Sequence, residues 1–281
     1  MDPGLHTALF RPGAIYPTWI SFWGQNKHTP DSEPGVQHVA LKLSNVPGEK
    51  YTGQESAHNL ILASHPVFPF ADVKTYASAI EAFSDNRQLS FFFNPLRPQL
   101  KAFRIHKAMS THHRDLLANR WWSVLPYRYG ADRAVKYSLR PCVDNASRPT
   151  NYGQGIAGNF LQERLRESLA GRSACFEFMV QFQTDAQTMP IEDPSVYWDE
   201  TIAPFQPIAR LFIPAQSVFA PRDAICEKLS FDPWRALSAH QPLGGINRAR
   251  RRIFSEVENR GVSENDALPE QTTSASSNPA F

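Results

Sequence analysis

The sequence predicts an α+β fold built on an antiparallel β-sheet or barrel with flanking helices. Two strand patterns carry this prediction: an alternating stretch that begins at Ala174, and an apolar run over 208–213. An irregular, proline-containing loop joins them, as expected for neighbouring antiparallel strands. The third observation is the presence of 23 prolines in 281 residues, which favours many irregular connections over long helices.

The alternating stretch places Phe176, Phe178 and Val180 on one face of a long strand, because successive side chains of a strand point to opposite faces. Glu177 and Gln181 fall on the other face, which is expected to be polar. The pattern therefore predicts a strand with a single buried face.

The N-terminal part of the chain shows three shorter strand patterns, over 16–23, 36–43 and 59–63. A helix is predicted over 73–83, since its apolar residues share one face and Asp72 stands in position to cap its N-terminus.

A second helix is predicted over 99–118, and it carries His106, His112 and His113. A metal site is one interpretation of these histidines. Adjacent helical residues point roughly 100° apart, so His112 and His113 would not face one ion together, and no carboxylate stands at a suitable offset. We therefore assign no metal ligands to this segment.

The second half of the chain adds a turn over 127–130, a strand over 135–141 and a helix over 159–169 that ends at Gly171. A basic segment over 248–260 is predicted to be helical. The basic run is short and the whole chain carries a formal net charge of only +2, which argues against a nucleic-acid surface. A solvated helix face or a contact with an anionic ligand explains these arginines better.

The sequence also contains features that predict the cellular compartment of the protein. No stretch of about 18 apolar residues occurs, so no membrane span is predicted, and the N-terminus lacks the charged and apolar regions of a signal peptide. The cysteines Cys142, Cys175 and Cys226 are odd in number and have no CxxC spacing. This pattern predicts reduced thiols and hence a cytoplasmic protein.

Three segments in fixed order carry a resemblance to a known family: FMVQFQTDAQTMPIEDPSVYWDE, IARLFIPAQ and LSFDPWRALSAHQPLGGINRARRRIF. They resemble the catalase superfamily, and more narrowly the small bacterial catalase-related haem proteins. The resemblance implies a catalase-like antiparallel barrel over residues 1–260 that holds haem b. Residues 261–281 are rich in Ser, Thr, Glu, Asn and Pro and are expected to form a disordered tail.

The resemblance also implies a haem site, position by position. A family arginine falls on Ser21, a propionate-binding arginine on Gln37, and the distal asparagine on Ser64. The proximal motif, an arginine followed four residues later by the iron-ligating tyrosine, falls on Arg250 and Phe254. The segment that carries the distal histidine is expected to be missing, so the barrel is expected to be shortened and incomplete.

These substitutions change what such a site can do. Phe254 has no oxygen with which to ligate iron. Ser21 and Gln37 carry no positive charge for haem propionates, which arginine binds strongly. Without a distal histidine, no base is in place to move the peroxide proton. The family implies haem-dependent turnover of hydrogen peroxide or organic hydroperoxides, whereas these residues predict impaired or absent catalase activity.

Three functions remain open. The first is a haem-binding, catalase-related peroxidase. The second is a degenerate relative without haem that serves as a binding or scaffold protein, in which an open barrel edge would favour a homo-oligomer. The third is a haem carrier or sensor in which His65, His240 or a cysteine replaces the tyrosine. A loop position without a ligand role is the simpler interpretation of both histidines.

Overall fold

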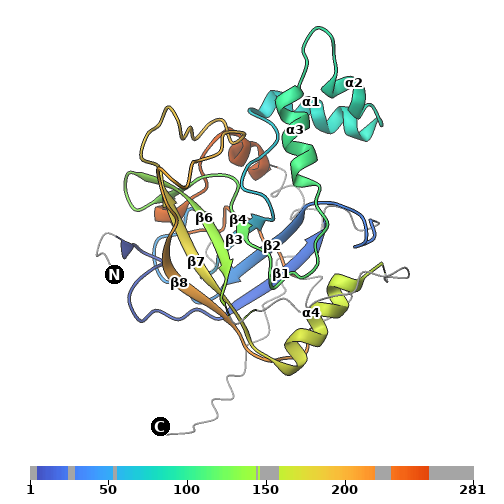
Figure 1. Cartoon of the computed structure of the whole chain (residues 1–281). Coiled ribbons are helices and arrows are strands. Elements are labelled where there is room, and N and C mark those ends of the chain that lie inside the picture. The colour runs from blue at the N-terminus through green and yellow to red at the C-terminus, as the bar shows by residue number, and fades with distance from the viewer. Residues whose placement is uncertain are drawn as a thin grey trace, which may run out of the picture.

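The computed structural model describes residues 5–24, 29–52, 56–143, 145, 158–218 and 229–252. They form one curled antiparallel sheet with helices around it (Figure 1). In chain order the elements are β1 (Thr18–Gly24), β2 (Gln37–Leu43), β3 (His58–Ala63), α1 (Val73–Ser84), α2 (Gln88–Phe92), α3 (Leu100–Met109), β4 (Trp121–Trp122), β5 (Tyr127–Tyr129), β6 (Arg133–Pro141), α4 (Phe160–Gly171), β7 (Ala174–Phe182), β8 (Gln206–Ile213) and the 3₁₀ helix η2 (Ser238–His240).

The eight-stranded sheet has the order β1-β2-β3-β4-β6-β7-β8, with β5 paired to β6 outside this path. Within the described residues, β1 pairs only with β2 and β8 only with β7, so these two strands form the ends of the sheet. The predicted α+β class and the antiparallel, incomplete barrel are therefore confirmed.

The two strand patterns that predicted the fold do pair, with Ala174 opposite Ile213. The expected single buried face of β7 is wrong, because Gln181 is only 1% exposed. Its side-chain nitrogen donates to the carbonyl oxygens of Trp198 and Ala203 at 2.9 and 2.8 Å. The loop between β7 and β8 folds back over the second face, which strand periodicity does not reveal.

The main core lies inside the curl of the sheet. Its largest fully buried side chains include Trp121, Tyr129, Tyr137 and Phe176 from four different strands. As predicted, α4 buries one apolar face, consisting of Leu161, Leu165 and Leu169, against this core.

Helices α1, α2 and α3 lie together and project away from the sheet (Figure 1). Asp72 caps α1 as predicted: its carboxylate accepts a hydrogen bond from the Thr75 amide nitrogen at 2.8 Å. The predicted helix over 99–118 is wrong beyond Met109, where α3 ends. The backbone of Thr111 instead bridges to Gly35, so the chain leaves helical geometry to join a distant segment.

The predicted turn over 127–130 is also only partly right. Residues Tyr127–Tyr129 form β5, in which Tyr127 pairs with Val135 of β6. The turn itself begins at Gly130. Its φ of 73° lies in the left-handed region, which glycine adopts more readily than other residues.

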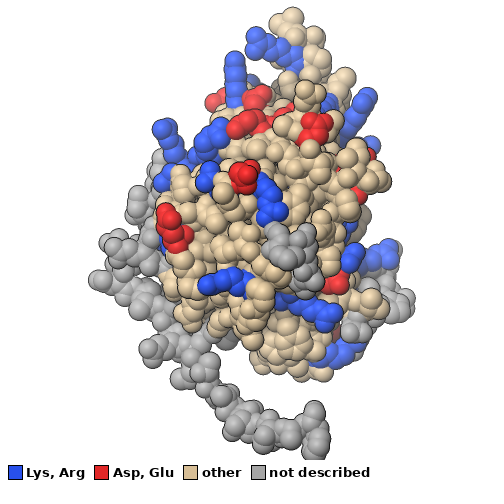
Figure 2. Space-filling view, turned by 90° about the vertical axis from the view of Figure 1, so that its left-hand side faces the viewer, with Lys and Arg blue, Asp and Glu red and all other residues tan. Residues whose placement is uncertain are grey.

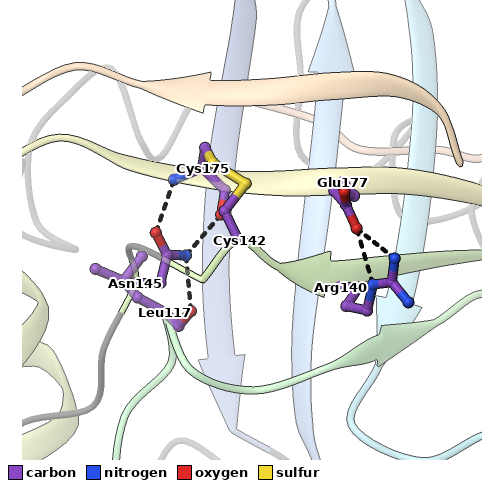
Figure 3. The surroundings of a disulfide bond; sticks show 6 residues. All are labelled: Leu117, Arg140, Cys142, Asn145, Cys175 and Glu177. Atoms are coloured by element: carbon purple, nitrogen blue, oxygen red, sulfur yellow. Dashed lines mark hydrogen bonds and ion pairs between the residues drawn. A yellow bond between two sulfur atoms is a disulfide. The ribbon is translucent and has the colours of Figure 1, made fainter.

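A disulfide joins Cys142 to Cys175, which corrects the prediction of three reduced thiols. In the β6–β7 register Pro141 lies opposite Phe176, so the next pair outward is Cys142 and Cys175, with Cα atoms 5.5 Å apart. Figure 3 shows Asn145 beside the bond, donating to the Cys175 carbonyl oxygen at 2.6 Å and accepting from its amide nitrogen at 2.9 Å. The free-thiol argument for a cytosolic protein therefore no longer holds, since disulfides persist mainly in oxidising compartments.

No helix in the described ranges combines the length and the apolar composition needed to cross a membrane.

Candidate functional site

Two of the positions predicted from the resemblance meet at the edge of the sheet where β2 begins and β3 ends. Gln37 opens β2 and Ser64 directly follows β3, and the two strands are paired there with His38 opposite Ala63. The Gln37 amide nitrogen donates to the Ser64 hydroxyl oxygen at 3.1 Å. The Ser64 amide nitrogen donates to the Gln37 carbonyl oxygen at 2.9 Å. The main chain of Gln37 thus pairs with the main chain and the hydroxyl group of Ser64.

His113 joins this pair, although the sequence assigned it no role. Its Nε2 lies 3.0 Å from the Gly35 carbonyl oxygen and 3.3 Å from the Ser64 hydroxyl, so Nε2 carries the hydrogen. The Asn119 amide lies 3.0 Å from Nδ1, which therefore accepts. Burial is the main cause that lowers the pKa of His113 and favours the neutral ring. We call Gln37, Ser64 and His113 the edge cluster.

Ser21 lies apart from the edge cluster. It stands on β1 opposite Ala40 and is half-buried. On the same strand, Trp23 stacks on His38 with ring centroids 5.4 Å apart. Burial, followed by the nearby charge of Arg250, lowers the pKa of His38 to about 4. This second area of the site therefore consists of packed aromatic rings and a neutral imidazole.

Arg250 is carried by a helix over 245–252 that begins against the loop between β7 and β8. Its guanidinium carbon lies 4.9 Å from the ring centroid of Phe68 and 5.9 Å from that of Tyr76. Both distances are typical of cation–π contacts. Phe254 lies outside the described residues.

Glu192 positions this helix. Its carboxylate accepts a hydrogen bond from the Gly245 amide nitrogen at 2.8 Å and from both terminal nitrogens of Arg248 at 3.1 and 3.0 Å. The hydrogen bond from Arg248 is the main cause that lowers the pKa of Glu192. A carboxylate at a helix N-terminus also meets the positive end of the helix dipole.

The histidines considered as replacement ligands are engaged elsewhere. His240 is fully buried in the core, with Nε2 3.1 Å from the Thr7 carbonyl oxygen and Nδ1 2.9 Å from the Tyr137 hydroxyl. It is a core residue of η2, so the interpretation as a plain loop histidine is wrong. His65 is half-buried, and its Nδ1 lies 3.2 Å from the Val67 carbonyl oxygen.

The cysteines offer no alternative ligand among the described residues, because Cys142 and Cys175 are joined to each other. Cys226 lies outside the described residues. Within the described ranges, no group of three or more His, Cys, Asp or Glu side chains could hold a metal ion.

The side chains at the predicted haem positions do not fit haem. Ser21, Gln37 and Ser64 offer no positive charge to a propionate, and Arg250 is turned onto aromatic rings. Two cavities among the described residues measure about 230 and about 10 Å³, and none of these four residues lines either of them. Pockets for ligands of haem size are typically several hundred Å³ or more.

No family model and no curated protein matches this chain. Solved structures of catalases do match. A bacterial catalase has a TM-score of 0.71 at 16% identity, covering 94% of this chain and 55% of that chain. A fungal catalase has a TM-score of 0.69 at 15% identity, covering 89% and 52%.

Catalase A from Saccharomyces cerevisiae has a TM-score of 0.71 at 14% identity, covering 94% of this chain and 58% of that chain. This chain thus spans little more than half the length of each of these catalases. At such low identity the agreement concerns the course of the backbone, and it confirms what the sequence resemblance implied about architecture. The chain has the catalase fold.

Proposed function

We propose that this protein is a catalase-fold binding protein that turns over peroxide poorly or not at all. The observation that carries the proposal is the edge cluster. At the positions where the resemblance implies a propionate arginine and the distal asparagine, the main chain of Gln37 is hydrogen-bonded to Ser64, and the Ser64 hydroxyl also contacts His113.

The chemistry of peroxide turnover makes demands that these residues do not meet. Haem propionates need cationic partners, and peroxide cleavage needs a base that accepts and returns a proton. In the edge cluster, His113 donates through Nε2 to a backbone carbonyl and accepts through Nδ1 from an amide, so both ring nitrogens are committed. Arg250 keeps its charge over aromatic rings.

A binding role would use the open edge of the sheet. β8 is an end strand of eight residues, and its Phe212 side chain is 64% exposed. Figure 2 faces the side on which β7 and β8 lie in Figure 1, and it shows mainly uncharged surface with scattered charges of both signs. An exposed end strand readily pairs with a second copy, since two such edges form a symmetric antiparallel ladder. We assign this edge to a homo-oligomer contact.

The experiment that tests the proposal combines haem reconstitution with activity. The purified chain is incubated with haem, desalted and examined by absorption spectroscopy and by oxygen release from hydrogen peroxide, with an authentic catalase as a positive control. We expect a folded protein by circular dichroism, without a stable Soret band and without oxygen release. A Soret band accompanied by rapid oxygen release would refute the proposal.

A Soret band without oxygen release would instead favour the haem carrier or sensor. The variant His65→Ala then tests the replacement ligand, because His65 is half-buried and burial lowers its pKa, which keeps its ring neutral and able to ligate. His112→Ala, at an exposed histidine, is the matched control.

A further inference from the structure

A small cavity lies where β6 meets the loop between β7 and β8. Its volume is about 10 Å³, which is room on the order of one water molecule or one monatomic anion. The cavity is lined by Pro66, Trp122, Lys136, Gln181, Tyr197, Trp198 and Phe205.

Three residues of this lining carry a buried nitrogen donor without a hydrogen-bond partner among the described residues: Lys136 Nζ, Trp122 Nε1 and Trp198 Nε1. Lys136 is 4% exposed and Trp198 is 1% exposed. Buried donors without acceptors are rare in native proteins, because a donor that loses its hydrogen bond to water and gains no acceptor destabilises the folded state. Their presence around one cavity points to a guest that accepts hydrogen bonds.

An anion, which only accepts hydrogen bonds, suits three unpartnered donors better than a water molecule does. Each of the two hydrogens of a water molecule needs an acceptor. None of the buried side-chain acceptors that lack a partner among the described residues lines the cavity. We infer that the cavity binds a halide-sized monovalent anion, held by the Lys136 ammonium group and the indole N–H groups of Trp122 and Trp198.

Two cations lie against the aromatic rings of the lining. Lys136 Nζ lies 5.0 Å from the ring centroid of Trp198. A second cation, Arg120, lies 4.9 Å from the Trp122 ring and 5.0 Å from the Phe205 ring, and it pairs with Glu200 at 3.0 Å.

Protonation of Lys136 links anion binding to pH. Burial lowers the pKa of Lys136 to about 7, and Asp193 partly opposes this shift. Asp193 is itself bound by the Ser195 amide and hydroxyl groups and lies 3.9 Å from the exposed Lys101. Since a bound anion favours the ammonium form, we expect tighter binding below pH 7 than above it.

The test uses bromide as the probe on the full chain. The melting temperature is measured at pH 6 in sodium gluconate and in sodium bromide at equal ionic strength, for the unsubstituted protein, Lys136→Met and Lys101→Met. Lys101 is the matched control, because it is an exposed lysine that faces the same aspartate. At bromide concentrations ten times the dissociation constant we expect a rise of about 3–6 °C in the unsubstituted protein and in Lys101→Met.

Lys136→Met should lose this rise, and the unsubstituted protein should lose most of it at pH 8.5. An equal bromide response in Lys136→Met, or no difference between bromide and gluconate for the unsubstituted protein, would overturn the inference. If Lys136→Met does not fold, anomalous diffraction from bromide-soaked crystals of the unsubstituted protein decides: a bromide peak in the cavity supports the site, and an empty cavity refutes it.

Discussion

The amide nitrogen of Gln37 donates to the hydroxyl oxygen of Ser64 at 3.1 Å, and the Ser64 amide nitrogen donates back to the Gln37 carbonyl oxygen at 2.9 Å. The two residues are 27 positions apart, and the β2–β3 register brings them together. The contact uses the main chain of Gln37 and the main chain and hydroxyl of Ser64, at positions where the family resemblance implies an arginine and an asparagine.

Removing the Ser64 hydroxyl should destabilise the protein without changing its response to peroxide. Ser64→Ala leaves the Gln37 N–H without its acceptor, and an unsatisfied, largely buried donor costs about 1–3 kcal/mol in the free energy of unfolding. Urea denaturation measures the loss. The control is Ser90→Ala on exposed α2, where the hydroxyl donates to the Arg87 carbonyl oxygen and the change should stay within about 0.5 kcal/mol. Equal effects of the two variants would contradict this account.

Buried His240 should make the fold sensitive to acid. Burial lowers its pKa from 6.5 to about 4, so between these values the unfolded chain binds a proton that the native protein does not. Stability therefore rises with pH across this window and is lost as pH falls from 6.5 towards 4, by roughly 2–3 kcal/mol for this one group. His240→Gln should flatten the pH dependence of urea unfolding between pH 4.5 and 7.5.

The exposed His112 serves as the control for this pH series. His112→Gln should keep the full slope of the unsubstituted protein. The account fails if both variants, or neither, flatten it. His58 is also buried in the core and its pKa is likewise lowered by burial, so some pH dependence should survive in His240→Gln.

The disulfide predicts a thiol count and a stability difference. Under denaturing, non-reducing conditions, one thiol, that of Cys226, should react with Ellman's reagent, since Cys142 and Cys175 are joined. Reduction or the double variant Cys142→Ser/Cys175→Ser frees a loop with a sequence separation of 33. Loop-closure entropy then predicts a loss of roughly 3–4 kcal/mol. Three reactive thiols in the untreated protein would show that the bond does not form.

Gly244 should not tolerate a side chain. Its φ is +88°, and a Cβ atom would lie 2.7 Å from the Ile191 carbonyl oxygen. Gly244→Ala should therefore cost about 2 kcal/mol or more and loosen the helix that carries Arg250. Gly171→Ala is the matched control, since a Cβ atom there meets no other atom within 4 Å. Thermal unfolding of both variants gives the comparison, and similar melting temperatures would count against the close approach.

The β8 edge predicts a concentration-dependent assembly. Phe212→Asp places a charge on this edge and should shift the protein from oligomer to monomer in sedimentation or light-scattering measurements. Its unfolding free energy should change little, because the side chain is 64% exposed. The control Leu89→Asp changes another exposed apolar residue, 72% exposed on α2, and should leave the assembly intact. A monomeric unsubstituted protein at high concentration would rule out the edge contact.

Local patterns in the sequence predicted much of this molecule. The alternation of Phe176 and Phe178, the cap at Asp72 and the apolar face of α4 all depend on residues close together in the chain, and all are found in the structure. The absence of a ligating oxygen at Phe254 also follows from residue identity alone. These features depend on local geometry and side-chain chemistry, which a single sequence states directly.

Only the tertiary structure decided which distant residues meet. His113 reaches Ser64 across 49 positions, and the Cys142–Cys175 bond follows from the register between β6 and β7. The second buried face of β7 and the cavity at Lys136 depend on how one loop folds back. Strand periodicity identifies faces but leaves register and loop paths open, because these are set by packing over the whole sheet.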